Sequence, residues 1–102
     1  MSSTIFEKKG STLNVWPEGR LDTATSPVLE KEVREQLDGV RHIIMDFERV
    51  EYISSGGLRA LLTIEKQIEE CDGEMRLFHV NENIMEIFEL VGFTNVVTVV
   101  QD

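Results

Sequence analysis

The chain has 102 residues, 41% of them hydrophobic, which suits one small domain with a buried core and argues against a disordered segment. Its formal charge is −9, from 19 acidic and 10 basic residues. This charge argues against nucleic acid as a partner, because phosphate backbones are bound by clustered lysine and arginine. An acidic surface instead favours solubility and a protein partner with a basic face.

The sequence indicates neither a membrane-spanning segment nor a signal peptide. No apolar run approaches the ~20 residues that span a bilayer, and the first residues lack the basic-then-apolar order of a signal peptide. The single cysteine, Cys71, cannot form an intrachain disulfide, and a lone cysteine is most often a small buried hydrophobe. We therefore expect one cytoplasmic domain over residues 1–102, with no metal, no cofactor and no membrane contact.

Two strands and a helix are predicted in the N-terminal part. Residues 4–8 and 12–16 have the composition of strands, and the Gly10-Ser11 turn between them predicts a hairpin. Pro17 is acceptable there only at an edge or a bulge. A helix follows, with Pro27 in its first turn, apolar residues four apart, and an end at residues 38–39. Its apolar stripe is Leu29, Val33 and Leu37, and its candidate caps are Thr23, Thr25 and Ser26.

A buried strand and a longer helix are predicted in the middle of the chain. Residues 42–45 form a short apolar run, typical of a strand covered on both faces, and Asp46 marks its end. Residues 50–53 lead from there into the second helix, which Gly73 is placed to stop. The apolar face of this helix consists of Leu58, Leu61, Leu62 and Ile68.

The C-terminal part repeats the alternation of strand and helix. Residues 75–80 are predicted to form a strand, in which Leu77 and Phe78 contribute most to the core. Asn81 or Asn83 is expected to cap a third helix, which Gly92 closes, and the β-branched residues 96–100 form a last strand. The third helix is expected to bury Ile84, Ile87, Phe88 and Val91.

The resulting order, ββαβαβαβ, predicts an α/β domain with a mixed sheet. The N-terminal hairpin is antiparallel, and the crossover helices make the other strands parallel. Functional sites in such sheets lie beyond the carboxyl ends of the parallel strands, where helices begin. Ser54 and Ser55 occupy such a place, and we expect Asp22 and Asp46 to flank them.

The sequence Ser54-Ser55-Gly56-Gly57 stands where the second helix begins. A helix N-terminus has unpaired N–H groups and a partial positive charge, so a serine oxygen can cap it and an anion can rest on it. The glycines are expected to leave the backbone open to another chain. A plain helix cap and a site that holds phosphate both fit this pattern.

Two enzymatic interpretations are disfavoured by the residues around the turn. A nucleotide-binding loop requires lysine followed by serine or threonine, whereas residues 58–60 are Leu-Arg-Ala. A hydrolase elbow requires a glycine before the serine, which is missing here. We therefore do not expect an enzyme.

Four stretches together resemble the STAS family, in particular the bacterial anti-sigma factor antagonists. They are GRLDTATSPVLEKEV, IIMDF, VEYISSGGLRALL and GFTNVV, and with the first hairpin they span nearly the whole chain. The most specific is the pattern over residues 52–62, and the Gly-Arg-Leu-Asp turn at residues 19–22 is the second marker.

The resemblance implies a phosphorylation switch. In such proteins the unphosphorylated antagonist binds an anti-sigma factor serine kinase and so releases a sigma factor. Phosphorylation by that kinase blocks binding, and a partner phosphatase reverses it. The serine aligned with the phosphorylated one is Ser55, and Asp22 aligns with an acidic residue near the site. The expected partner-binding residues are Asp22, Ser54, Ser55, Gly56, Gly57 and Leu58.

The chain departs from the common family pattern Asp-Ser-Ser/Thr-Gly at two positions. Ser54 stands where the aspartate is usual, and Gly56 replaces the second hydroxyl. Ser54 is therefore an alternative phosphoacceptor. The resemblance also leaves open a second function, that of a non-switching accessory domain packed against a transporter ATPase subunit.

Overall fold

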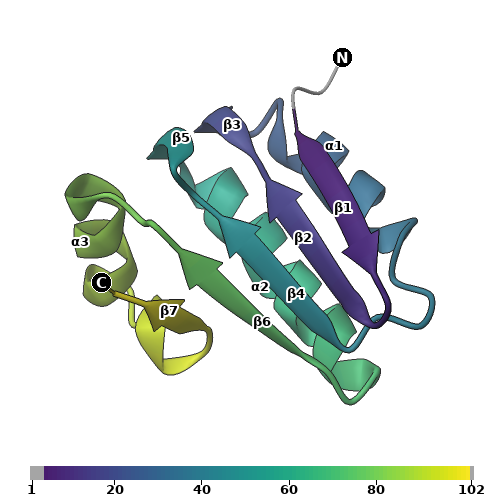
Figure 1. The fold of residues 1–102 in the computed structure, drawn as a ribbon. Helices are drawn as coiled ribbons and strands as arrows, with labels where there is room; N and C mark the ends of the chain where they lie inside the picture. The colour runs from purple at the N-terminus through teal and green to yellow at the C-terminus, as the bar shows by residue number, and fades with distance from the viewer. Residues whose placement is uncertain (1–3, 102) are drawn as a thin grey trace.

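Five strands form the main sheet in the order β1-β2-β4-β6-β7, and the computed structural model describes residues 4–101 (Figure 1). β1 runs antiparallel to β2, and the remaining neighbours are parallel. The predicted α/β class, the N-terminal hairpin and the mixed sheet are therefore confirmed. The strands are β1 (Ile5–Lys9), β2 (Thr12–Trp16), β4 (His42–Asp46), β6 (Glu74–Phe78) and β7 (Thr98–Val100).

Two helices, α1 (Ser26–Arg34) and α2 (Ser55–Glu70), lie side by side on one face of the sheet (Figure 1). A third helix, α3 (Glu82–Leu90), and the short 3-10 helix η1 (Phe93–Asn95) lie toward the side of β6 and β7. None of the helices in residues 4–101 combines the length and apolar character that crossing a bilayer requires.

Alternation along the strands places the core between the sheet and the two helices. Every second residue of β2, β4 and β6 is buried, and α2 packs against them through residues at three- and four-residue spacing. The strand residues are Leu13, Val15, Ile43, Met45, Met75 and Leu77, and the helix residues are Leu61, Ile64 and Ile68.

The opposite face of the sheet is not covered by a helix (Figure 1). The prediction that residues 42–45 are covered on both faces is therefore wrong: His42 is exposed, and Ile44 is only half-buried. The short apolar run gave no way to distinguish one covered face from two.

A second, two-stranded parallel sheet was not predicted. It pairs β3 (Glu18–Leu21) with β5 (Arg49–Ile53), with an irregular register between Gly19 and Arg20. In β5 the buried residues are Val50 and Ile53, three apart, so the period of two that marks a strand is absent. This small sheet ends where α1 and α2 begin.

The ends of three elements also differ from, or decide between, the predicted ones. α1 ends at Arg34 and not near Gly39, with Glu35 as its C-cap. β7 begins at Thr98 and not at residue 96, because Gly92 adopts a left-handed φ of 74° and residues 93–95 then form η1. Asn81, of the two candidates, caps α3, its side chain accepting the Ile84 N–H at 2.9 Å.

Seven side chains expected in the core are not fully buried. Leu62 is 42% exposed, Val91 is 58% exposed, and Cys71 is exposed. The half-buried ones are Leu37, Leu58, Phe78 and Ile87, and Met75 takes the place of Phe78 in the core. Leu62 and Val91 were assigned to apolar helix faces from spacing alone, although each lies at the edge of its face. Their exposure contributes to the surface described below.

Candidate functional site

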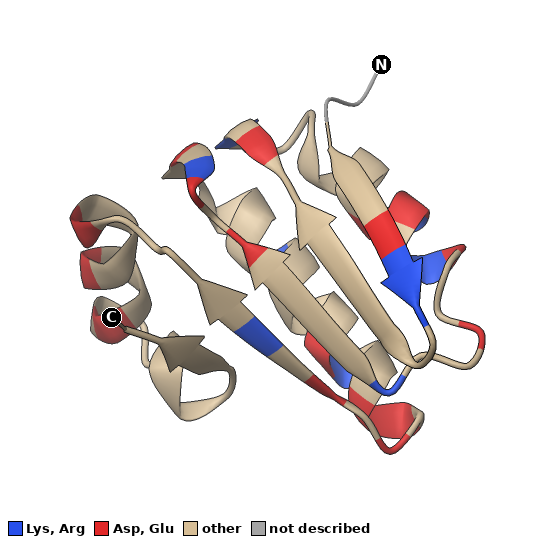
Figure 2. Cartoon of the chain, in the orientation of Figure 1, with Lys and Arg blue, Asp and Glu red and all other residues tan. Residues whose placement is uncertain are grey.

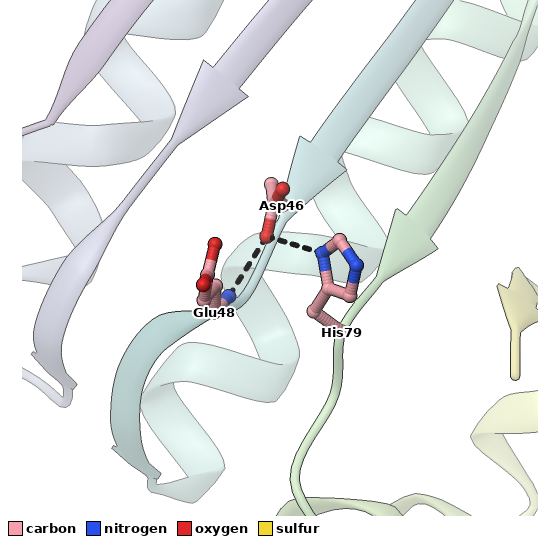
Figure 3. A group of neighbouring side chains, drawn as sticks. All are labelled: Asp46, Glu48 and His79. Atoms are coloured by element: carbon pink, nitrogen blue, oxygen red, sulfur yellow. Dashed lines mark hydrogen bonds and ion pairs between the residues drawn. The ribbon is translucent and has the colours of Figure 1, made fainter. Parts of the chain in front are cut away.

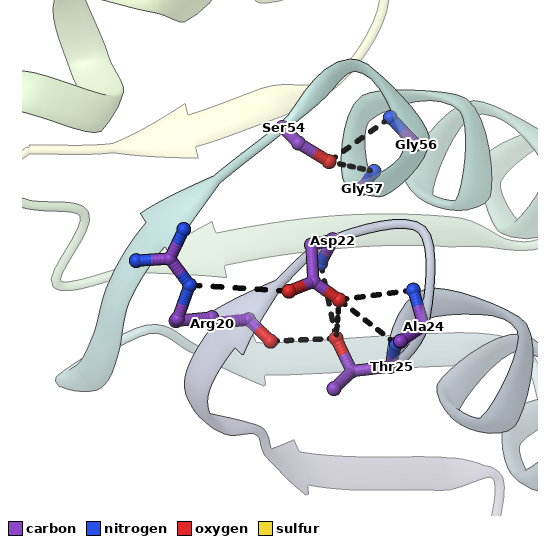
Figure 4. A network of polar contacts seen from close by, with 7 residues as sticks. All are labelled: Arg20, Asp22, Ala24, Thr25, Ser54, Gly56 and Gly57. Carbon is purple, nitrogen blue, oxygen red and sulfur yellow. Dashed lines mark hydrogen bonds and ion pairs between the residues drawn. The ribbon is translucent and has the colours of Figure 1, made fainter.

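The β5–α2 turn uses one of its two serines as a helix cap. Ser54 has extended backbone angles, and its Oγ accepts hydrogen bonds from the N–H groups of Gly56 at 3.2 Å and Gly57 at 3.5 Å (Figure 4). These N–H groups would otherwise lack acceptors at the start of the helix. Ser55 is the first residue of α2 and is exposed, as predicted.

The glycines bring another segment of the same chain close to α2. A Cβ atom on Gly57 would lie 2.6 Å from both the Leu21 carbonyl oxygen and Ile53 Cγ1, and one on Gly56 would lie 3.0 Å from Thr23 Cγ2. The Leu21 carbonyl also accepts the Ser54 N–H at 2.9 Å. The expectation that both glycines are open to a partner is therefore wrong for Gly57, which is buried.

Asp22 organises the loop between β3 and α1. Its Oδ1 accepts the N–H groups of Thr25 and Ala24, each at 3.0 Å (Figure 4). Thr25 does not cap α1 through its side chain; its Oγ1 donates to the Arg20 carbonyl at 2.6 Å. The hydrogen bonds from the Thr25 and Ala24 amides lower the pKa of the Asp22 carboxyl, which keeps it ionised.

A positive charge accompanies this carboxylate. Arg20 Nε lies 3.9 Å from Asp22 Oδ2, and its guanidinium stacks 4.4 Å from the centre of the Tyr52 ring. The loop that carries Asp22 therefore presents a carboxylate and a guanidinium together. Asp46, expected to flank the serines with Asp22, bonds to His79 and to the Glu48 N–H.

Ser55 lies at the rim of a groove of about 330 Å³. One side is formed by α2, and the other by the segment that follows α3. The α2 residues are Ser55, Leu58, Arg59 and Leu62, and the others are Val91, Gly92, Phe93 and Val96. Because Leu62, Val91 and Val96 are all exposed, the groove is an apolar surface with Arg59 as its one basic lining residue.

Arg59 also borders a second hollow of about 410 Å³ between α1 and α2, which reaches Thr23 and Gly56. The structure thus brings together the expected partner-binding residues of the 22 and 54–58 segments. It adds residues 91–96, which were assigned to a core face and a strand and not to the site. The sequence signal for this segment is GFTNVV, one of the four stretches that carry the family resemblance.

Comparison with known proteins agrees with the fold. The model of the STAS domain matches residues 4–102. BtrV of Bordetella bronchiseptica, named as an anti-sigma factor antagonist, is 36% identical over 80 residues, which are 78% of this chain and 69% of that protein. The anti-sigma-B factor antagonist of Staphylococcus aureus is 32% identical over 82 residues, 79% of this chain and 76% of that protein.

Solved structures extend the likeness in fold. The anti-sigma factor antagonist SpoIIAA in its unphosphorylated form gives a TM-score of 0.78 at 17% identity, over 98% of this chain and 89% of that one. The same protein in its phosphorylated form gives a TM-score of 0.76 over 98% and 93% of the two chains. At this identity the match shows a shared fold.

Proposed function

Because the chain belongs to the STAS domain family, we propose that it is an anti-sigma factor antagonist controlled by phosphorylation of Ser55. Unmodified, it binds an anti-sigma factor serine kinase and thereby releases a sigma factor for transcription. Phosphorylated, it leaves the kinase until a phosphatase restores it. The protein acts by binding and not as an enzyme, and it works in the cytoplasm as a single domain.

The observation that carries this proposal is the different use of the two serines. Ser54 Oγ accepts two backbone N–H groups and lies partly buried within the turn. Ser55 is exposed on the first turn of α2 and borders the apolar groove. A kinase can therefore reach the Ser55 hydroxyl without undoing the helix cap, which favours Ser55 over Ser54 as phosphoacceptor.

A phosphate on Ser55 would change the binding face more than the fold. It adds about −1.5 to −2 charges at neutral pH, directly at the rim of an apolar surface that a partner has to desolvate. The first turn of α2 has no acidic residue, and the partial positive charge of the helix start stabilises an anion by ~0.3–1 kcal/mol. The fold therefore tolerates the phosphate, whereas a docked partner does not.

Kinase treatment with mass spectrometry tests the proposal. The cognate anti-sigma kinase and ATP should place one phosphate on Ser55 in the wild type and in Ser54→Ala, and none in Ser55→Ala, which should still bind the kinase. Phosphate on Ser54 alone would move the site by one residue. Absence of both phosphate and binding would reject the antagonist role in favour of the transporter-associated alternative.

A further inference from the structure

Three potential metal ligands gather at the carboxyl ends of β4 and β6, and none of them lines the groove beside Ser55. They are Asp46, Glu48 and His79 (Figure 3). Each offers one ligand atom, and these atoms all lie within 4.8 Å of one another. His79 Nδ1 lies 3.0 Å from Asp46 Oδ1. Nothing in the proposed antagonist role uses these side chains.

The fold brings the three together from separate segments. Asp46 is the last residue of β4, and its Oδ1 accepts the Glu48 N–H at 2.9 Å, which folds the next residues back toward it. The Phe47 N–H donates to the Phe78 carbonyl at 2.8 Å and so ties the ends of the two strands together. His79 follows directly in a left-handed conformation, with φ of 57°, and its ring is directed to Asp46 (Figure 3).

We propose that Asp46, Glu48 and His79 bind a divalent transition-metal ion such as Zn²⁺. One imidazole nitrogen with two carboxylates is a ligand set that zinc and its neighbours accept, whereas Mg²⁺ and Ca²⁺ prefer oxygen alone. The ion takes the position between Nδ1 and the Asp46 carboxylate, the Nδ1 proton passes to Nε2 or to solvent, and water completes the coordination.

The opposite end of the same two strands supplies a matched control. There His42 Nδ1 lies 3.8 Å from Glu74 Oε1, across the directly paired positions of β4 and β6. Glu74 also binds Arg76 Nη2 at 2.9 Å. This histidine–carboxylate pair resembles His79–Asp46 but is not part of a cluster of metal-ligating side chains in the described part of the chain. It should not hold the ion.

The experiment is calorimetric titration with Zn²⁺ at neutral pH. Cys71 is replaced by serine in every protein, because its exposed thiol would compete for zinc. His79→Asn is the test variant, since asparagine tolerates the left-handed conformation. Asp46→Asn keeps an acceptor for the Glu48 N–H while removing the charge, and His42→Asn is the control.

We expect one zinc site, with affinity reduced about tenfold or more in His79→Asn and in Asp46→Asn and unchanged in His42→Asn. Histidine ¹⁵N spectra should show zinc-dependent shifts at His79 and none at His42. Equal zinc affinity in the Cys71→Ser parent protein and in its His79→Asn variant, or no measurable zinc binding, would overturn the proposal. Circular dichroism of each variant identifies a loss caused by unfolding, and in that case the ¹⁵N spectra of the folded Cys71→Ser protein decide the matter.

Discussion

At the scale of single residues, the site depends on two adjacent serines that the helix treats differently. Ser54 precedes α2, and its side chain accepts hydrogen bonds from the N–H groups of Gly56 and Gly57, while Ser55 is the first residue of the helix and is exposed. The family pattern places aspartate where Ser54 stands, and aspartate is an equally good cap. The departure from the pattern therefore preserves the turn while removing one negative charge beside Ser55.

The first prediction concerns this cap. Ser54→Ala should lower the free energy of unfolding by ~1 kcal/mol, because the Gly56 and Gly57 N–H groups lose their acceptor. Ser54→Asp should stay within a few tenths of a kcal/mol of the wild type, roughly the spread among good caps. Urea unfolding followed by circular dichroism measures both. An equal loss in the two variants would show that Ser54 does not act through its side-chain oxygen.

The second prediction concerns Gly57. Gly57→Ala should destabilise the protein by about 1–3 kcal/mol, because the new methyl group would overlap the Leu21 carbonyl and the Ile53 side chain. Gly56→Ala is the control and should cost less, since its closest neighbour is the Thr23 methyl group. Thermal melts of the two variants compare them. A larger loss for Gly56→Ala would contradict the packing described here.

At the scale of elements, the periodicity of apolar residues predicted the helices and strands that form the core, but not the small sheet or the groove at the candidate site. α2 and α3 were predicted because buried residues recur every three or four positions, and the alternation of strands and helices gave the parallel sheet. β3 was missed because it has only four residues, and β5 because its buried residues, Val50 and Ile53, lie three apart and not two. The groove beside Ser55 joins α2 to residues 91–96, which are far apart in sequence, so only the folded chain reveals it.

The third prediction belongs to α2, where Glu65 is buried on the core side. Burial, with a hydrogen bond to Glu69, raises the pKa of the Glu65 carboxyl from 4.5 to about 7. Between these values the folded chain keeps a proton that the unfolded chain has lost, so the free energy of unfolding falls as the pH rises. Glu65→Gln should remove this fall and stabilise the protein above neutral pH by on the order of 1–3 kcal/mol.

Unfolding by urea across this pH range checks the prediction. The exposed Glu70→Gln, on the same helix, serves as the control and should follow the wild-type pH dependence. Curves for Glu65→Gln and wild type that run parallel over the whole range would show that the Glu65 carboxyl is not responsible.

The fourth prediction concerns the surface that α2 shares with the segment after α3. Leu62→Gln should leave stability within about 0.5 kcal/mol, because the side chain is exposed. It should weaken binding to the anti-sigma kinase about tenfold, since the groove that Ser55 also lines loses an apolar contact. Val28→Gln, equally exposed on α1 and outside the groove, is the control. Equal kinase affinity for both variants would exclude the groove from the interface.

At the scale of the whole molecule, the distribution of charged residues bears on how the protein meets a partner. Acidic residues gather on α3 and around the α2–β6 turn, while the start of α2 is free of them (Figure 2). With a formal charge of −9, the protein should associate faster with a basic partner, and salt should slow that association. The first turn of α2 carries no acidic residue, so a phosphate on Ser55 would introduce negative charge where that turn has none.

The resemblance in sequence supplied the family and the site segment, because its motifs lie in the turns that connect strands to helices. It did not supply the neighbours of those residues. Only the three-dimensional packing shows that Leu21 takes up the space beside Gly57. The same is true of Asp22, whose carboxylate accepts hydrogen bonds from the amides of residues 24 and 25. The turn residues of the candidate site could thus be named from sequence, whereas their contacts, and the part that residues 91–96 take in the groove, could not.

The most direct test of the account is the affinity of the cognate anti-sigma kinase for protein that carries phosphoserine at position 55, measured by calorimetry beside the unmodified protein. We predict that the phosphate weakens binding about a hundredfold or more while the melting temperature and circular dichroism of the domain stay nearly unchanged. Equal affinity of the two forms for the kinase would contradict the claim that Ser55 is the switch.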